Sequence, residues 1–353
     1  MGRPRFAMQA SYPLGKLPAE HLARLLEHYA PPDERVVLGP GVGRDAAVIS
    51  LGDRYLVAKT DPITFASREI GWYAVHVNAN DIACTGATVR WFLATLLLPE
   101  GHADAASVDA IFDQISGACA ELDVALVGGH TEITHGLDRP VVVGCMLGEV
   151  APERLVRPEG ARPGDALLVT KGIAVEGTAI IAREKSSGLA GLNGSLLERC
   201  RGFLQEPGIS VVHDAAVATA MGEVHAMHDP TEGGLATGLW ELAEAAGVGL
   251  EVDEDAIPVF SETRALCERL GLDPLGLIAS GALLLAVACG DAAAILAALE
   301  EAGIAAAHIG RVVEREDLQA SAARSRRRIV LRSAAGERPL PRFARDEIAR
   351  LFE

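Results

Sequence analysis

Four short segments of the chain place an acidic or polar side chain beside small residues, at the end of a predicted strand or the start of a predicted helix. They contain Asp45 in G-V-G-R-D-A-A, Asp61 in K-T-D-P, Asp81 in V-N-A-N-D-I-A, and the predicted turn G-G-H-T-E at residues 128–132. Carboxylates that the fold brings together repel one another, and Mg²⁺ relieves this because it prefers oxygen ligands. Glycine N–H groups are common donors to phosphate. The pattern therefore indicates a site for a metal ion and a nucleotide.

Each segment also has an explanation that involves no ligand. An Asp before a helix is most often an N-cap, because its carboxylate accepts a bond from a free backbone N–H group. Asp81 follows Asn80 within a helical pattern and fits a polar kink. The single motifs do not decide between the two explanations, but the order in which they follow one another along the chain does.

The elements that must position these residues alternate between strands and helices in both halves of the chain, which indicates α/β or α+β layering. Apolar runs bounded by turn residues predict strands at 46–50, 55–59, 124–127, 141–147, 166–170, 282–288, 305–312 and 329–331. Helical spacing of apolar residues predicts helices around 22–26, at 70–83, around 108–115, at 177–183, from 234 onward and at 292–302.

Length and composition set the number of domains and the expected compartment. A chain of 353 residues with 49% hydrophobic residues is long enough for two globular domains. A turn-rich polar stretch at 154–164 predicts the boundary between a domain at 1–155 and a second domain at 160–353. The sequence shows no signal peptide and no apolar run of membrane-spanning length. Its six cysteines form no C-x-x-C pair, so we expect free thiols in the cytoplasm.

The charge of the chain argues against two classes of partner. A net charge of −16 repels nucleic acid and anionic membranes, so neither is expected. Free ATP is repelled as well, and a nucleotide site therefore needs metal ions or local N–H donors. The run Arg324–Arg328 is short and is interpreted as a solvated turn. His225-x-x-His228 has the helical spacing of metal ligands, but without further ligands we interpret His228 as a capping or substrate-facing residue.

Taken in order, the motifs resemble those of the aminoimidazole ribonucleotide synthetase (PurM)-like superfamily. This superfamily also includes thiamine-monophosphate kinase, selenophosphate synthetase and the hydrogenase maturation factor HypE, and the resemblance is closest to HypE-like relatives. The matching stretches are G-R-D-A-A-V (43–48), T-D-P (60–62), V-N-A-N-D-I-A-x-x-G-A (77–87), G-G-H-T (128–131), P-G-D (163–165), E-G-T-A-I (176–180), H-D-P-T-E-G-G-L (228–235) and S-G-A-L-L (280–284).

The resemblance implies a fold and a reaction class. It implies a two-domain PurM-like fold, with an N-terminal α/β domain that forms a barrel with its copy in a homodimer and a C-terminal α+β domain. It implies an enzyme that binds ATP with Mg²⁺ and transfers a phosphoryl group to an acceptor oxygen of amide, carboxylate or phosphate type. The acceptor is a small molecule or a protein that the sequence does not identify.

The resemblance also assigns residues to the site. It implies that Asp45, Asp61 and Asp81 bind metal, and it leaves His130 as a candidate catalytic residue. Because His130 stands where many relatives have an acid, either Glu132 replaces that acid as a ligand, or one metal ion is lost, or a softer metal binds. The residues that it places at the nucleotide and its phosphates are Lys16, Asn80, Gly128, Gly129, Thr131, Asp229, Thr231, Glu232, Gly233 and Gly234.

Departures from the family pattern keep two alternatives open. His130 stands where many relatives have an acid, and a neutral imidazole is a poor Mg²⁺ ligand. Arg44 replaces another frequent acid, and the last cysteine is Cys289, whereas HypE proper ends in a reactive cysteine. Selenophosphate synthetase uses a reactive residue near its N-terminus, but the first cysteine here is Cys84. The alternatives are a small-metabolite kinase resembling thiamine-monophosphate kinase, and a noncatalytic nucleotide-binding scaffold for maturation.

Overall fold

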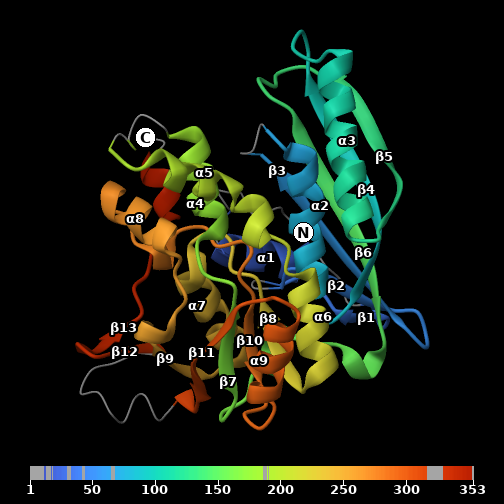
Figure 1. Cartoon of the computed structure of the whole chain (residues 1–353). Coiled ribbons are helices and arrows are strands. Elements are labelled where there is room, and N and C mark those ends of the chain that lie inside the picture. Colours follow the sequence, from blue (N-terminus) through green and yellow to red (C-terminus); the bar gives the residue numbers. More distant parts are fainter. Residues whose placement is uncertain are drawn as a thin grey trace.

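The computed structural model of the chain describes residues 12, 17, 19–29, 33–41, 44–64, 68–185, 189, 191–315 and 329–351. Two units, each made of one β-sheet with helices packed on it, lie side by side (Figure 1). The first half of the chain builds one sheet and the second half builds the other, which agrees with the predicted two-domain α/β architecture. Lys16 and residues 186–188 and 316–328 lie outside the described residues.

The first sheet has the strand order β1-β2-β3-β6-β4-β5. Neighbouring strands run antiparallel except for β4 and β5, which are parallel. The strands are β1 (Val36–Leu38), β2 (Ala47–Ser50), β3 (Tyr55–Ile63), β4 (Thr88–Pro99), β5 (Ala125–Thr134) and β6 (Val141–Val150). A short helix, α1 (Ala19–Tyr29), precedes them.

Helices α2 (Ile70–Ala83) and α3 (Ala105–Glu121) pack on this sheet and bury its core. Phe92 and Leu96 of β4 pack with Ile115 of α3 in that core. Gly71 allows α2 and α3 to approach closely, since a Cβ there would lie 2.5 Å from a backbone oxygen of α3. Thus α2, which contains Asn80 and Asp81, packs against both the sheet and α3.

The second sheet has the strand order β13-β12-β9-β11-β7-β10-β8. Its strands are β7 (Ala166–Thr170), β8 (Val224–His228), β9 (Gly249–Asp253), β10 (Leu284–Val287), β11 (Ala306–Val313), β12 (Ile329–Ser333) and β13 (Gly336–Pro339). The helices of this half are α4 (Val175–Glu184), α5 (Gly194–Gly202), α6 (Val212–Met221), α7 (Gly234–Ala246), α8 (Ser261–Leu270) and α9 (Ala292–Glu301).

Different helices cover the two faces of the second sheet. Leu167 and Val169 of β7 pack in one core with α7, and Leu168 packs on the opposite face with α6 and α9. The neighbouring strands β7 and β10 are therefore buried on both faces, which explains their predominantly apolar sequences. The side chains of Glu251 and Arg311 lie on β9 and β11, which are interior strands of this sheet, and Arg311 is nevertheless exposed.

The two halves are joined by hydrogen bonds of one buried carboxamide. The Nδ2 of Asn80 donates to the carbonyl oxygen of Ile209 at 2.8 Å, and its Oδ1 accepts from the amide of Val211 at 2.9 Å. The amide of Val156 also donates to the carbonyl oxygen of Thr85 at 2.9 Å. These bonds fix the end of α2 against the second half of the chain.

Most predicted elements are confirmed, but three assignments are wrong. Residues 128–132 form no turn: they lie inside β5, which is exposed rather than buried. The strand predicted at 55–59 continues to Ile63, so Asp61 lies within it. His225 and His228 lie on strand β8, not on a helix. Strand β4 was not predicted.

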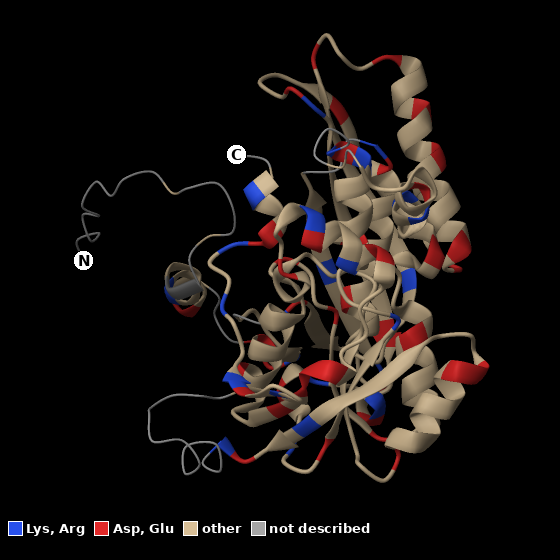
Figure 2. Cartoon of the chain, turned by 60° about the vertical axis from the view of Figure 1, so that its left-hand side comes forward, with Lys and Arg blue, Asp and Glu red and all other residues tan. Residues whose placement is uncertain are grey.

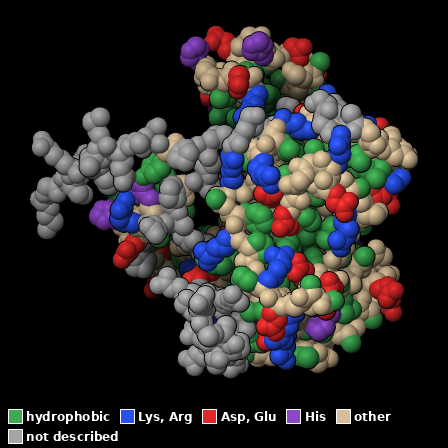
Figure 3. Space-filling view, turned by 90° about the vertical axis from the view of Figure 1, so that its left-hand side faces the viewer, with side chains coloured by type: hydrophobic (Ala, Val, Ile, Leu, Met, Phe, Trp, Pro, Cys, Tyr) green, Lys and Arg blue, Asp and Glu red, His purple; other side chains and the backbone are tan. Residues whose placement is uncertain are grey.

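Charged side chains are distributed over the whole molecule. Acidic residues occur in both halves (Figure 2), and on the face in Figure 3 basic, acidic and hydrophobic side chains are interspersed. All six cysteines are free thiols. Within the described ranges no helix combines the length and apolar character required to cross a membrane.

Candidate functional site

Charged side chains from both halves of the chain meet where the end of α2 faces β8 and the start of α7. The N-terminal half contributes three acids and one lysine, and the C-terminal half contributes two acids and one histidine. We call these residues the interdomain cluster: Asp45, Lys59, Asp61, Asp81, His228, Asp229 and Glu241. All three predicted metal-binding aspartates, Asp45, Asp61 and Asp81, belong to it.

Lys59 lies between two of these aspartates. Its Nζ is 2.8 Å from Oδ2 of Asp81 and 3.5 Å from Oδ2 of Asp61. The lysine and Asp81 side chains are only 12% and 7% exposed, whereas Asp61 is 41% exposed. Burial opposes the charged ammonium, but Asp81, Asp61 and Asp45 outweigh it and raise the pKa of Lys59. Lys59 is therefore a permanent cation of the cluster.

Strand and helix geometry explain this placement. Lys59 and Asp61 are two residues apart on β3, so their side chains point to the same side of the sheet. Asp81 lies in the last turn of α2, which packs on β3. Pro62 is tolerated because β2 pairs with β3 only as far as Ala58, and beyond it one edge of β3 has no partner strand.

Asp81 and Asp229 face each other across the two halves of the chain. Burial raises the pKa of Asp81, Asp229 raises it further, and Lys59 opposes the change. Burial likewise raises the pKa of Asp229 to about 6, with His228 opposing and Asp45 adding to the change. One oxygen of Asp229, Oδ2, is buried without a hydrogen-bond partner. Such an oxygen is an acceptor that the protein itself does not use.

Cys84 contacts this pair but is not an activated nucleophile. Its Sγ donates to Oδ1 of Asp229 at 3.5 Å. Burial raises the pKa of the Cys84 thiol well above its usual value, and the charges of Asp229 and Asp81 raise it further. The thiol therefore stays protonated, and it acts as a hydrogen-bond donor to Asp229.

His228 is the second cation of the cluster. Its Nε2 lies 2.7 Å from Oε2 of Glu241, and its Nδ1 lies 3.8 Å from Oδ2 of Asp45. Burial opposes protonation, but the bond to Glu241 and the charge of Asp45 outweigh it and raise the pKa of His228 to about 9. The ring is consequently charged at neutral pH and links Glu241 of α7 to the loop that carries Asp45.

The donor chemistry of the cluster suits a hard cation, but its geometry does not form a complete metal site. Carboxylate oxygens are the ligands that Mg²⁺ prefers. Yet among the residues that the structure describes, no three His, Cys, Asp or Glu side chains are arranged to hold a metal ion. The ammonium of Lys59 occupies the space between Asp61 and Asp81. A three-aspartate metal site therefore does not fit the side chains as they stand.

The residues predicted at 128–132 lie away from this cluster in the same chain. The sheet register aligns Asp61 with Gly144, Gly144 with Ala94, and Ala94 with Gly129. Three strand spacings separate Asp61 from Gly129, which is about 14 Å. Gly129 has φ +148°, and a Cβ there would lie 1.8 Å from the carbonyl oxygen of Ala94. Only glycine therefore fits this position beside β4.

Three further residues predicted for the site follow Gly129 on β5. The Nε2 of His130 lies 3.2 Å from Oε2 of Glu132, and both side chains are largely exposed. Thr131 lies between them and is exposed as well. Thus Glu132 does not join the three aspartates of its own chain, and His130 contacts an acid rather than the interdomain cluster.

The predicted loop at 229–234 connects β8 to α7 and begins in the cluster. Beyond Asp229 the chain turns, and Gly233 and Gly234 have φ +83° and +64°. The amide of Gly234 donates to the carbonyl oxygen of Thr231 at 3.0 Å. The amide of Gly233 donates to Oδ2 of Asp346 at 2.6 Å. The side chain of Glu232, which directly precedes the two glycines, is exposed.

Asn80 and Lys16 complete the predicted set. Both ends of the Asn80 carboxamide bond to the backbone at 209–211, so in this structure Asn80 joins the two halves of the chain. Lys16 lies outside the described residues. The sequence analysis missed the roles of Lys59, Glu241 and Cys84. The only sequence signal for Lys59 was its position two residues before Asp61.

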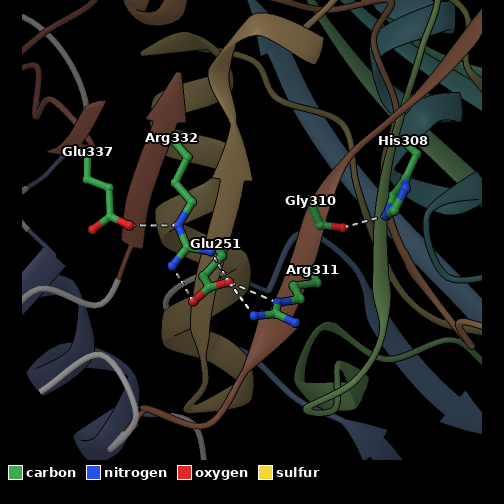
Figure 4. Close-up of polar contacts among 6 residues, drawn as sticks. All are labelled: Glu251, His308, Gly310, Arg311, Arg332 and Glu337. Carbon is green, nitrogen blue, oxygen red and sulfur yellow. Dashed lines mark hydrogen bonds and ion pairs between the residues drawn. The ribbon is translucent and has the colours of Figure 1, made fainter. Parts of the chain in front are cut away.

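A second charged region lies on the open face of the second sheet (Figure 4). Here a hollow of about 460 Å³ is lined by residues of β9, β11 and β12. The carboxylate of Glu251 lies 2.7 Å from Arg311 and 2.8 Å from Arg332. Arg332 also contacts Glu337 at 3.0 Å. We call this region the surface hollow; it contains none of the residues predicted for the site.

Comparison with known proteins gives matches along most of the chain. The sequence model of the AIR synthase related protein N-terminal domain matches residues 43–150, and that of the C-terminal domain matches residues 162–322. Carbamoyl dehydratase HypE of Cupriavidus necator is 34% identical over 284 residues, which cover 77% of either chain. HypE of Rhizobium leguminosarum bv. viciae is 32% identical over 288 residues, again covering 77% of both.

A similar solved structure carries a nucleotide. The crystal structure of hydrogenase maturation protein HypE in complex with ATP superimposes with a TM-score of 0.70 at 28% identity. The superposition covers 95% of this chain and 97% of the other. The similarity thus extends over both sheets and the interface between them.

Proposed function

Because this chain belongs to the AIR synthase related protein family and is close to HypE, we propose that it is an ATP- and Mg²⁺-dependent phosphoryl-transfer enzyme. In this proposal it activates an acceptor oxygen of amide, carboxylate or phosphate type. The observation that supports it most strongly is the convergence of Asp45, Asp61, Asp81 and Asp229 at the interface of the two halves. Acids far apart in sequence meet there with two cations, Lys59 and His228.

The nucleotide phosphates approach the cluster from its exposed side. Asp45 and Asp61 are 45% and 41% exposed, whereas Asp81 is nearly buried. The cavity that reaches Asp45, His228 and Glu241 measures about 20 Å³, which is room for about one water molecule. The exposed carboxylates of Asp45 and Asp61 would contact Mg²⁺ carried by the nucleotide, and the ion would offset the repulsion between an acidic protein and ATP.

The chain's own residues then act by position and charge. Lys59 and His228 offset the repulsion among the acids, and the hydrogen bonds of Asn80 hold α2 against the second half. Positioning and charge stabilisation supply most of the rate in phosphoryl transfer. No protein nucleophile is required, which agrees with a protonated Cys84 thiol.

A second copy of the chain completes the proposed site. Strand β5 is an exposed edge strand, with Val127 and Ile133 exposed by 53% and 61%. Uncovered apolar edges are places where sheets extend into a partner. We propose a homodimer joined at β5, in which the segment around Gly128 and Gly129 approaches nucleotide bound to the partner. The Gly segment and Asp61 of one chain are too far apart to contact the same phosphate directly.

The proposed domain boundary lies at residues 155–160. Short 3₁₀ turns at Pro152–Arg154 and Pro158–Gly160 flank this segment. The two family models end and begin on either side of it, at residues 150 and 162. Both observations support domains at 1–155 and 160–353.

Removing two carboxylates of the cluster tests the enzymatic proposal. We expect Asp61→Asn and Asp81→Asn each to lower Mg²⁺-ATP turnover by about 100-fold or more, because both hold charge at the phosphates. ADP release is measured with candidate acceptors that a thermal-shift screen selects, and circular dichroism checks folding. The matched control is Glu251→Gln in the surface hollow, which should retain turnover.

The product distinguishes the proposal from its alternatives. Release of ADP and phosphate with a dehydrated or condensed product supports a synthetase-type reaction, whereas a stable phosphorylated acceptor indicates a small-metabolite kinase. A parent protein that binds ATP without any turnover indicates a noncatalytic maturation scaffold. Turnover that survives both substitutions contradicts the proposed site.

The dimer is tested separately by light scattering coupled to size-exclusion chromatography. We expect the mass of two chains for the parent and of one chain for Ile133→Lys, because a charge on an apolar edge opposes strand pairing. Phe112→Lys is the control, since Phe112 is also exposed, by 41%, but lies on α3. A monomeric parent, or a dimeric Ile133→Lys protein, contradicts an interface at β5.

A further inference from the structure

The interdomain cluster holds a cation that belongs to the chain itself. The ammonium of Lys59 contacts Asp81 at 2.8 Å and lies 3.5 Å from Asp61, two of the acids predicted to bind metal. With only 12% of its side chain exposed, Lys59 cannot be an ordinary solvated surface lysine. Its charge sits where carboxylates from a strand and a helix converge.

This position is one that a divalent ion would otherwise occupy. Mg²⁺ bridges carboxylates because it neutralises their repulsion with oxygen ligands at short range. A lysine ammonium also neutralises carboxylates, through three N–H donors, but it is fixed to the backbone and excludes a second cation from the same space. Consistent with that exclusion, the described residues offer no group of three ligands for a metal ion.

We propose that Lys59 is a fixed cation of the nucleotide site and takes the place of one protein-bound divalent ion between Asp61 and Asp81. The metal ion that remains is the one that arrives on the nucleotide phosphates. This second statement rests on the proposed function, whereas the first concerns the protein without nucleotide. Lys59 is thereby a positioning residue that sets how many metal ions the site holds.

Counting bound Mn²⁺ by electron paramagnetic resonance tests the proposal in the full chain without nucleotide. The parent protein and Lys59→Arg, which keeps the charge, should bind no Mn²⁺ at the cluster. Lys59→Ser leaves Asp61 and Asp81 without their cation, so it should gain one bound Mn²⁺ with affinity about tenfold or more above the parent. Tight Mn²⁺ binding by the nucleotide-free parent overturns the proposal.

A matched control removes a similar lysine elsewhere. Lys171 lies 3.1 Å from Asp214, and the two side chains are 9% and 2% exposed. Lys171→Ser should gain no Mn²⁺ site, because only one carboxylate faces the lost ammonium. A Lys59→Ser protein that is folded by circular dichroism and gains no Mn²⁺ site also overturns the proposal.

Two further measurements keep the outcome decisive. If Lys59→Ser unfolds, the nucleotide-free parent decides alone, because a parent that binds Mn²⁺ tightly contradicts a lysine in the metal's place and one that binds none supports it. With a non-hydrolysable ATP analogue, the parent should bind one Mn²⁺ fewer than Lys59→Ser. If no variant binds the analogue, the proposed function fails. The number of Mn²⁺ ions bound without nucleotide still tests the proposed role of Lys59.

Discussion

The interdomain cluster and the surface hollow are built on the same arrangement with opposite signs. In the cluster a lysine lies between two aspartates, and in the hollow a glutamate, Glu251, lies between two arginines. The two central residues are buried to a similar degree, since Lys59 is 12% and Glu251 14% exposed. Their partners differ: Asp81 is 7% exposed, whereas Arg311 and Arg332 are 63% and 48% exposed. Burial therefore separates two regions that look alike in charge.

The two regions also differ in whether their charged groups already have partners within the protein. In the hollow both guanidinium groups contact Glu251, and Arg332 also contacts Glu337, so an incoming anion must displace existing partners. In the cluster the acids outnumber the cations, and Oδ2 of Asp229 has no hydrogen-bond partner. Unsatisfied buried groups reduce stability and are retained where a ligand uses them. A large cavity is consequently a poorer guide to this site than buried charge.

The largest expected effect is a loss of stability when the central residue of each region, Lys59 or Glu251, loses its charge. Lys59→Met leaves buried Asp81 without its cation, so we expect the free energy of unfolding at pH 7 to fall by about 3 kcal/mol. Glu251→Gln breaks ion pairs whose arginines are exposed to solvent, so it should lower the free energy of unfolding by less than about 1 kcal/mol. Urea denaturation of the two variants gives both values. Equal losses would contradict burial as the difference between the two regions.

How far the sequence predicted the cluster depends on what each residue required. Asp45, Asp81 and Asp229 were singled out by motifs, and the structure brings them together, while their ligand roles stay predictions. Lys59 was missed because the strand was predicted to end at Lys59, before Thr60-Asp61-Pro62, which hid that Lys59 and Asp61 share one side of β3. Whether a proline ends a strand depends on which edge has a partner, and that is decided by tertiary structure.

Strand β5 shows the same limit in another way. A Gly-Gly pair is typical of a turn, and the sequence predicted one at 128 and 129. In the structure they lie in an edge strand, where Gly129 allows close approach to β4. A local sequence pattern indicates which backbone conformations a glycine permits. It does not indicate whether a neighbouring strand runs beside that glycine.

The second prediction concerns pH and the second cation. The folded pKa of His228, about 9, exceeds its usual value of 6.5, so its contribution to stability is complete below pH 6.5 and is lost as pH rises through 9. We expect the free energy of unfolding to fall across this range by up to about 3 kcal/mol. Urea denaturation at several pH values measures the slope.

A matched pair of variants locates the source of that slope. Glu241→Gln removes the bond partner of His228, at 2.7 Å, and should flatten the profile between pH 6.5 and 9. Glu251→Gln, in the surface hollow, should leave the profile unchanged. A slope that survives in Glu241→Gln would assign the pH dependence to groups other than His228.

The smallest expected effect has the opposite sign and belongs to Asp229. Its pKa of about 6 means that the ionised form, present at pH 8, is disfavoured in the folded protein. Asp229→Asn keeps the acceptor for Cys84 and removes a charge that repels Asp81 and Asp45, so we expect stabilisation by about 1 kcal/mol, or a Tm higher by about 1–2 °C. Calorimetry at pH 8 measures the Tm, and the same variant should lose ATP turnover. A lower Tm would mean that attraction to His228 outweighs burial and repulsion, and the cluster would then be as fully compensated as the surface hollow.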